Sequence, residues 1–243
     1  MFGMEFTEFI SSLLLIIAID IVLGGDNALV IAMASRKLPA EQKKKAIFYG
    51  TALAILIRIV ATVAAAMLLQ VKYLFLVGGL ILVWISYKLL ADENESHDIQ
   101  AGNNLMQAIK TIVLADVMMG LDNVLAIAGA AHGELLIIII GLLISVPIMI
   151  WGSNLILKAM ERYAWLIYAG SAVLAWTAAK MITHEKAIEH LFVSPWVLYG
   201  FKLFVVALVI GAGLWSRTRM NKASQLHKKH EIELEEKNQA TGS

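Results

Sequence analysis

The sequence predicts an all-α polytopic membrane protein with seven transmembrane helices, built as an inverted repeat of two three-helix halves plus a seventh helix. Three observations lead to this prediction. Hydrophobic residues make up 59% of the 243 residues and charged residues only 16%, whereas soluble domains carry about 25% charged residues. Seven apolar segments come close to or exceed the roughly 20 residues needed to cross a bilayer. A polar motif in the first segment returns in the fourth.

The expected spans follow one another through short polar connections. They cover about 6–35, 43–69, 72–91, 105–131, 134–156, 163–183 and 196–215. We therefore expect a transmembrane domain at 1–215, which divides into repeat A at about 6–91, repeat B at about 105–183 and the extra helix at about 196–215. Residues 216–243 carry charges of both signs, which is typical of a solvated tail.

Lys and Arg placement predicts the orientation. Fourteen of the 20 Lys and Arg residues fall on one side of the expected membrane, and only Lys72, Lys180 and Lys186 fall on the other. The N-terminus is therefore expected outside and the C-terminus in the cytoplasm, which agrees with an odd number of spans. Basic patches interleaved with aromatic residues do not occur, so we expect no nucleic-acid partner. The chain has no cysteine, which excludes disulfides and thiolate metal sites.

The repeated motif is DIVLGGDNALVIAMA at 20–34, which returns as DVMMGLDNVLAIAGA at 116–130. At an offset of 96, eight of fifteen positions are identical. The identical pairs include Asp20/Asp116, Gly24/Gly120, Asp26/Asp122 and Asn27/Asn123. A weaker echo joins the third and sixth spans at an offset of 92, through Trp84/Trp176 and Lys88/Lys180. Because each half has three spans, the second half enters the membrane from the opposite side, and such repeats place a binding site near the midplane.

The first motif is expected to interrupt its helix. On a regular helix, residues six positions apart are turned about 120° from each other, so Asp20 and Asp26 would not share a face. Gly24-Gly25, and Gly120 in the second half, could let each helix break. Asp26-Asn27 and Asp122-Asn123 would then begin half-helices, where both residue types are good caps. Only one glycine stands in the second motif, so the two helices could unwind unequally.

The four aspartates have a structural and a functional explanation. The structural one is that they are buried acids paired with Arg58, Lys110 or backbone donors. Four intramembrane carboxylates cost on the order of 10 kcal/mol before compensation, and these two cations are too few to neutralise them. The repeat doubles that cost. We therefore favour a functional site.

The chemistry of the motif predicts a divalent metal ion as the ligand. Carboxylate and amide oxygens suit Mg²⁺, Mn²⁺ or Ca²⁺ rather than Zn²⁺ or Cu⁺. The candidate metal residues are Asp20, Asp26, Asn27, Asp116, Asp122 and Asn123. Ser153 and Asn154 could add ligands or bond between helices. Met118 and Met119 could soften the site towards Mn²⁺, although filling of apolar space is the favoured explanation. No organic cofactor is indicated.

These features resemble the TerC family of integral membrane proteins. The resemblance rests on the paired D-x₅-D-N motifs and on GGLILVWISYKLL in the third span, and it runs from about residue 6 to 215. It implies metal-ion efflux, chiefly of manganese, with the six candidate residues as the metal site. It also implies the short bacterial type, hence the plasma membrane. The metal ion and the lipid bilayer are the expected partners, with membrane-protein partners and oligomeric state left open.

Three functions are compatible with the sequence. The leading one is a secondary transporter that exports divalent metal, with Mn²⁺ first, by proton antiport. The second is an intramembrane metalloenzyme, and the third is a non-transporting protein that supplies metal to exported proteins. We expect no enzyme, because HExxH, GxSxG and a nucleophile–base set do not occur in the sequence. A P-loop for ATP is also missing from it.

The orientation can be tested by cysteine labelling, because the chain has no cysteine of its own. Single cysteines at residue 243 and within 92–104 should react with membrane-impermeant reagents from the cytoplasmic side. Cysteines at residue 1 and within 185–190 should react only from outside. Labelling of residue 1 from the cytoplasm would contradict the inverted repeat.

Overall fold

The computed structural model describes residues 6–64, 67, 71–91, 101–131, 134–216 and 218. Over these residues the regular secondary structure is all helical. The elements are α1 (Phe6–Leu23), α2 (Gly25–Ser35), α3 (Ala40–Val63), α5 (Leu74–Ala91), α6 (Ala101–Ala130), α7 (Leu135–Arg162), α8 (Trp165–Thr183), a 3₁₀ turn (Glu189–Phe192) and a C-terminal helix (Pro195–Ser216). Within these described residues, five helices are long and apolar enough to span a membrane, and the pair α1–α2 makes a sixth if it is one bent span.

Each predicted segment contains a helix, with shifted ends, but the described residues show at most six candidate spans, so seven spans stay a prediction. The expected span 43–69 corresponds to α3, which begins at Ala40 directly after Pro39, a residue suited to the start of a helix. The expected span 134–156 corresponds to α7, which continues to Arg162, because a helix need not stop where its apolar run ends. The predicted polar connection at 92–104 ends earlier than expected, because α6 begins at Ala101. Residues 92–100 of this connection, and residues 217 and 219–243 of the predicted tail, lie outside the described residues.

The predicted break in the first span is confirmed. α1 ends at Leu23 and α2 begins at Gly25, and their axes are bent by 46°. Gly24 lies between them with φ −94° and ψ 3°, and its amide donates to the carbonyl oxygen of Asp20 at 2.8 Å. Asp26 and Asn27 fall in the first turn of α2, but neither side chain caps it, because the cap position is Gly24 itself.

The prediction of a corresponding break in the second motif is wrong. α6 runs without interruption through Gly120, so Asp122 and Asn123 do not begin a half-helix. The physical reason is the difference that the sequence already shows: Leu121 stands where the first motif has its second glycine. Each glycine weakens a helix by about 1 kcal/mol relative to alanine, so one glycine is easier to keep helical than two.

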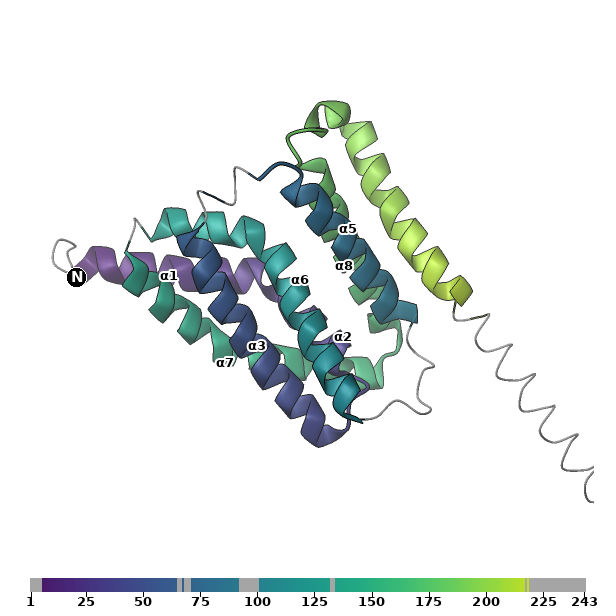
Figure 1. Cartoon of the computed structure of the whole chain (residues 1–243), viewed down its shortest axis with the longest axis horizontal. Coiled ribbons are helices and arrows are strands. Elements are labelled where there is room, and N and C mark those ends of the chain that lie inside the picture. The colour runs from purple at the N-terminus through teal and green to yellow at the C-terminus, as the bar shows by residue number, and fades with distance from the viewer. Residues whose placement is uncertain are drawn as a thin grey trace, which may run out of the picture.

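The helices pack in a pattern that joins distant parts of the chain. α3 lies along α6, α7 lies along both α1 and α2, α5 pairs with α8, and α6 crosses α1 and α2. Figure 1 shows α1 and α2 leading from the N-terminus at the left to the lower edge, while α6 leads from that edge back towards the left. The motif-bearing helices are thus antiparallel. The C-terminal helix packs on α8 through Val205 and Val209 against Ala175 and Ala179.

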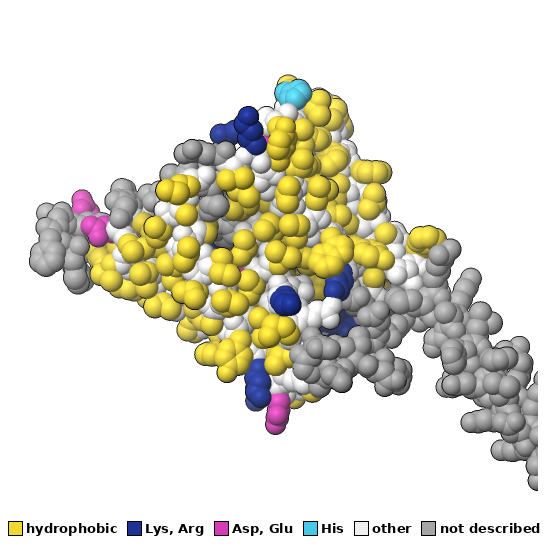
Figure 2. Space-filling view, viewed as in Figure 1, with side chains coloured by type: hydrophobic (Ala, Val, Ile, Leu, Met, Phe, Trp, Pro, Cys, Tyr) yellow, Lys and Arg dark blue, Asp and Glu magenta, His cyan; other side chains and the backbone are white. Residues whose placement is uncertain are grey.

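The surface of the helical body is apolar. Large hydrophobic side chains such as Leu56, Trp151 and Phe204 are exposed along α3, α7 and the C-terminal helix, and hydrophobic atoms dominate the face in Figure 2. Contiguous apolar surface on this scale marks contact with lipid or another protein rather than with water. The arrangement therefore surrounds the polar motifs with helices that face lipid.

The break at Gly24 gives a testable prediction. A methyl group at Gly24 would overlap the carbonyl oxygen of Asp20, whereas a methyl group at Gly25 meets no atom within 4 Å. Gly24→Ala should therefore lower the free energy of unfolding by about 1–3 kcal/mol, the usual range for overpacking. Gly25→Ala is the matched control and should be neutral. SDS-induced unfolding in mixed micelles measures both, and equal stability of the two variants would contradict the packing at the break.

Candidate metal-binding site

The first motif supplies three polar side chains at the break between α1 and α2. Asp20 lies in the last turn of α1 and is fully buried, and Asn27 in α2 is buried as well. Asp26, in the first turn of α2, is only partly buried. The bend at Gly24 changes the direction of the chain between the two aspartates, which a regular helix could not do.

Helix α3 brings a positively charged side chain to the break between α1 and α2. The buried residues of α3 recur at intervals of three and four, as on one face of a helix. Gly50 lets this face approach α6 closely, since a methyl group there would lie 2.9 Å from Ile112. Arg58 lies two turns further along the same face, with 2% of its surface exposed. A buried arginine needs partners for its charge.

Arg58 bridges the two motifs. Its Nη1 donates to Oδ1 of Asp20 in α1, and its Nη2 donates to Oδ1 of Asp116 in α6. Both contacts are ion pairs between buried side chains. The structural explanation, pairing with Arg58, thus holds for Asp20 and Asp116, although one guanidinium does not neutralise two carboxylates. Lys110 is exposed on α6 and has no such role.

Two hydroxyl groups from the second half complete the polar contacts. Ser145 of α7 donates to Oδ2 of Asp20, so this carboxylate is bonded through both oxygens. Thr177 of α8 lies 3.5 Å from Oδ2 of Asp26. Residues of α1, α2, α3, α6, α7 and α8 therefore all meet at the motifs.

Several buried polar atoms nearby have no hydrogen-bond partner among the described residues. They are Oδ1 of Asp26, both amide atoms of Asn27, Oγ1 of Thr51, Nε of Arg58, Oδ2 of Asp116 and Nδ2 of Asn123. Native proteins leave few buried polar atoms unpaired. A cluster of them, most of them oxygens, is a place suited to bind a polar ligand or a cation.

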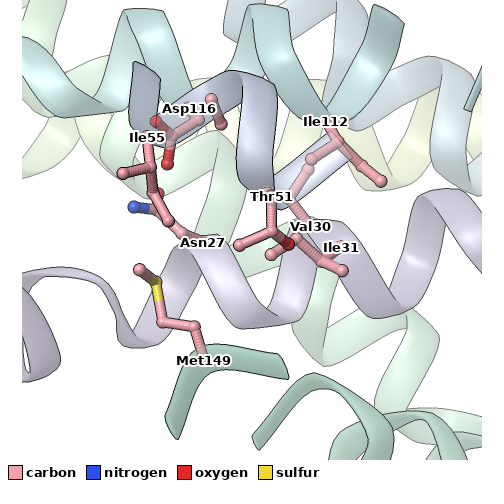
Figure 3. Close-up of a pocket in the computed structure, with 9 residues that line it drawn as sticks. Asn27, Val30, Ile31, Thr51, Ile55, Ile112, Asp116 and Met149 are labelled. Carbon is pink, nitrogen blue, oxygen red and sulfur yellow. The ribbon is translucent and has the colours of Figure 1, made fainter. Parts of the chain in front are cut away.

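A small cavity of about 10 Å³ opens beside these atoms. Figure 3 shows Asn27 of α2, Thr51 of α3, Asp116 of α6 and Met149 of α7 around it. The volume is about that of one water-sized probe. Its lining combines an amide, a hydroxyl, a carboxylate and a thioether, and the remaining walls are aliphatic.

The structure brings together most of the predicted site, though not as a closed cage of ligands. Asp20 and Asp116 bind Arg58, Asn27 and Asp116 line the cavity, and Asp26 lies at the start of α2 against Thr177. Asn123 is buried in α6, and the side chain of Asp122 lies outside the described residues. Within the described part of the chain, no three His, Asp or Glu side chains are close enough to hold one metal ion. The two carboxylates that Arg58 bridges nevertheless keep a net charge of −1 when all three groups are ionised.

The comparisons with known proteins bear on this site. A family model described as integral membrane protein TerC family matches residues 5–221. The chain belongs to the TerC family of integral membrane proteins. Its two motifs, with Arg58 between them, are therefore buried within the helices of an integral membrane protein of that family.

This TerC-family chain has curated relatives in bacteria. It is 49% identical over 182 residues to the uncharacterized membrane protein YjbE of Bacillus subtilis (strain 168), which covers 75% of this chain and 84% of the relative. It is 27% identical over 195 residues to the uncharacterized membrane protein YkoY of the same strain, covering 72% and 60%. The UPF0053 inner membrane protein YgdQ of Escherichia coli (strain K12) is 26% identical over 163 residues, covering 60% and 68%. No solved structure matches the chain.

Some site residues of the TerC-family chain were not predicted. Ser145, Thr177, Thr51 and Met149 carry no signal of their own, because single hydroxyl and thioether groups are common in apolar helices. Ser153 and Asn154 both donate to the carbonyl oxygen of Ile150 in their own helix rather than between helices, and their role as ligands stays a prediction. The explanation that Met118 and Met119 fill apolar space is confirmed, because Met119 is buried in the largest hydrophobic cluster and Met118 packs against it.

The contact of Ser145 with Asp20 gives a second prediction. Ser145→Ala removes the donor to Oδ2 of Asp20 and should lower the free energy of unfolding by about 1–3 kcal/mol, the cost of leaving a buried acceptor unpaired. Ser153→Ala is the matched control, because Ser153 is equally buried in α7 but bonds only to its own helix. SDS-induced unfolding of the two purified variants makes the comparison. A loss in Ser153→Ala as large as in Ser145→Ala would contradict the contact.

Proposed function

We propose that this TerC-family protein is a secondary transporter that exports divalent metal cations, with Mn²⁺ as the first candidate. The observation that carries the proposal is the convergence of Asp20 and Asp116, the first aspartates of the two motifs, on a single cation, Arg58, inside a membrane protein. Ionisable residues buried within membrane helices are expensive and mark ion pathways. The negative excess that remains after Arg58 is counted favours a cation.

The donor set narrows the class of cation. Asp20, Asp26, Asp116 and Asn27 offer oxygen atoms, and such sets suit Mg²⁺, Mn²⁺ and Ca²⁺. The thioether of Met149 lines the same cavity as Asn27 and Asp116. Sulfur is a softer ligand than oxygen, so it favours Mn²⁺ over Mg²⁺ and Ca²⁺. Mn²⁺ is also the ion that the resemblance to the family implies.

We propose further that the chain forms seven spans arranged as an inverted repeat, with α1–α2, α3 and α5 equivalent to α6, α7 and α8. Equivalent helices should then make equivalent contacts. α3 lies on α6 as α7 lies on α1 and α2, and α5 pairs with its counterpart α8. At single residues, Gly50 of α3 faces Ile112 of α6, while Gly141 of α7 faces Ile16 of α1. Ile16 and Ile112 are separated by 96 positions, the offset of the two motifs.

The proposed location is the bacterial plasma membrane, with the N-terminus outside and the C-terminus in the cytoplasm. The uneven distribution of Lys and Arg along the sequence supports this orientation. Metal would then bind from the cytoplasmic side and leave outward. We propose that protons return inward, because the net negative charge of the site must be compensated when a divalent cation leaves low-dielectric surroundings.

The proposal can be tested by transport in proteoliposomes loaded with Mn²⁺. A pH gradient should drive Mn²⁺ across the membrane by the purified protein, with proton movement in the opposite direction. Asp→Asn at 20, 26, 116 or 122 should reduce this flux by about tenfold or more, since each loses a charge that the cation needs. In cells, the same variants should insert into the membrane but fail to protect against Mn²⁺. Glu161→Gln, at an exposed acid paired with Lys43 on the surface, is the matched control and should remain active.

The outcomes separate the alternatives. Flux that ignores the pH gradient and moves no protons would refute antiport alone. Binding of Mn²⁺ without flux would refute export and favour a protein that supplies metal to exported proteins. Full activity in three of the four aspartate variants would show that the site is assigned wrongly.

A further inference from the structure

Arg58 reaches both motifs with a single side chain. Its two terminal nitrogens bind Oδ1 of Asp20 and Oδ1 of Asp116. These two aspartates are the equivalent first residues of the repeated motif, 96 positions apart. The guanidinium thus lies between the two carboxylates of the proposed metal site that correspond to each other.

The second half has no matching cation. Gly50 and Gly141 make equivalent contacts with Ile112 and Ile16, which aligns α3 with α7 at an offset of 91. The counterpart of Arg58 is then Met149. The contacts of the motif glycines agree with this alignment: a methyl group at Gly120 would lie 3.7 Å from Nε of Arg58, and one at Gly24 would lie 3.5 Å from Sδ of Met149. The fold therefore carries one guanidinium where its symmetry offers two places.

One guanidinium holds the carboxylates together but does not neutralise them. Each oxygen that accepts a hydrogen bond from Arg58 is also one that a divalent cation would bind. A cation at these oxygens would lie close to the guanidinium, and a doubly and a singly positive charge at hydrogen-bonding distances repel strongly in a protein interior. Arg58 and the cation therefore cannot both occupy the gap between Asp20 and Asp116.

We infer that Arg58 competes with the transported cation for Asp20 and Asp116, acting as a tethered cation that takes the place of the substrate between the two motifs after its release. The inference rests on the proposed function and adds a specific part to it. Arg58 lets the two carboxylates stay buried when no substrate is bound, and it helps to expel the substrate by binding the same oxygens. Competition from Arg58 thereby lowers the affinity of the site for the transported cation, so that the cation can be released.

The competition predicts that removal of Arg58 strengthens binding. If Arg58 covers the carboxylates more than about 90% of the time, the apparent affinity is lowered about tenfold. Arg58→Met keeps the length and volume of the aliphatic stem without the charge, so the purified full-length variant in nanodiscs should bind Mn²⁺ about tenfold more tightly or better in titration calorimetry. Its transport turnover should fall, because release is slower. Arg162→Met, at an exposed arginine at the end of α7, is the matched control and should bind as the unaltered chain does.

A purely structural ion pair predicts the opposite result. Removal of Arg58 would then leave two buried carboxylates unpaired, which is strongly destabilising, and Mn²⁺ binding would weaken. Thermal unfolding separates the two cases: under competition, saturating Mn²⁺ restores the stability of Arg58→Met, while a structural pair leaves the variant equally unstable with and without the ion. Unchanged or weaker binding in Arg58→Met overturns the inference.

Arg58→Lys decides the matter if Arg58→Met cannot be purified. Lysine keeps the charge but lacks the planar fork that spans two carboxylates. The Arg58→Lys variant should therefore bind Mn²⁺ about threefold more tightly than the unaltered chain, an affinity between those of the unaltered chain and Arg58→Met. Binding no tighter than in the unaltered chain would overturn the competition. If the unaltered chain itself binds no Mn²⁺ while it remains folded, the proposed function fails first, and this result is distinct from a failure of the competition.

Discussion

The bridge from Arg58 to Asp20 and Asp116 is the interaction on which the rest of the structure depends. It joins α1, α3 and α6 at a depth where water cannot compensate charge, and Ser145 adds α7 to the same contact. Breaking one partner of such a buried pair leaves an uncompensated charge and costs about 3–5 kcal/mol. The close approach of α3 to α6 at Gly50 follows from this requirement, because the guanidinium must reach both carboxylates at once.

The second constraint is the unequal backbone of the two motifs. The bend at Gly24 separates Asp20 from Asp26 and leaves Asn27 facing the cavity, whereas α6 carries Asp116 and Asn123 on an unbroken helix. The backbone stays hydrogen-bonded across the break, because the amide of Gly24 donates to Asp20 and its carbonyl oxygen accepts from Ala28. The two motifs therefore hold their first aspartates on different backbones, one at a bend and one within a continuous helix.

Much of this architecture is predictable from the sequence, and the limits have physical causes. The repeated motif predicts the meeting of Asp20 and Asp116, and the glycine pair predicts the break, because both depend on local chemistry. The continuity of α6 was missed, since one glycine permits either outcome. The role of Arg58 was undervalued, because counting charges does not show that one guanidinium can reach two carboxylates. Ser145 and Thr177 could not be found, since their distance from the motifs depends on tertiary packing alone.

The asymmetry between Arg58 and Met149 connects the charge of the site to its substrate. Arg58 compensates one of the two charges of Asp20 and Asp116, so the bridge keeps a net charge of −1 when all three groups are ionised. A second arginine in place of Met149 would neutralise the pair and leave no attraction for a cation, while the absence of both would leave −2 in low-dielectric surroundings, which is costly. The single arginine thus lets the pair stay buried and still negative, as the proposed cation site requires, and the place of its counterpart is taken by Met149, whose thioether lines the cavity with Asn27 and Asp116.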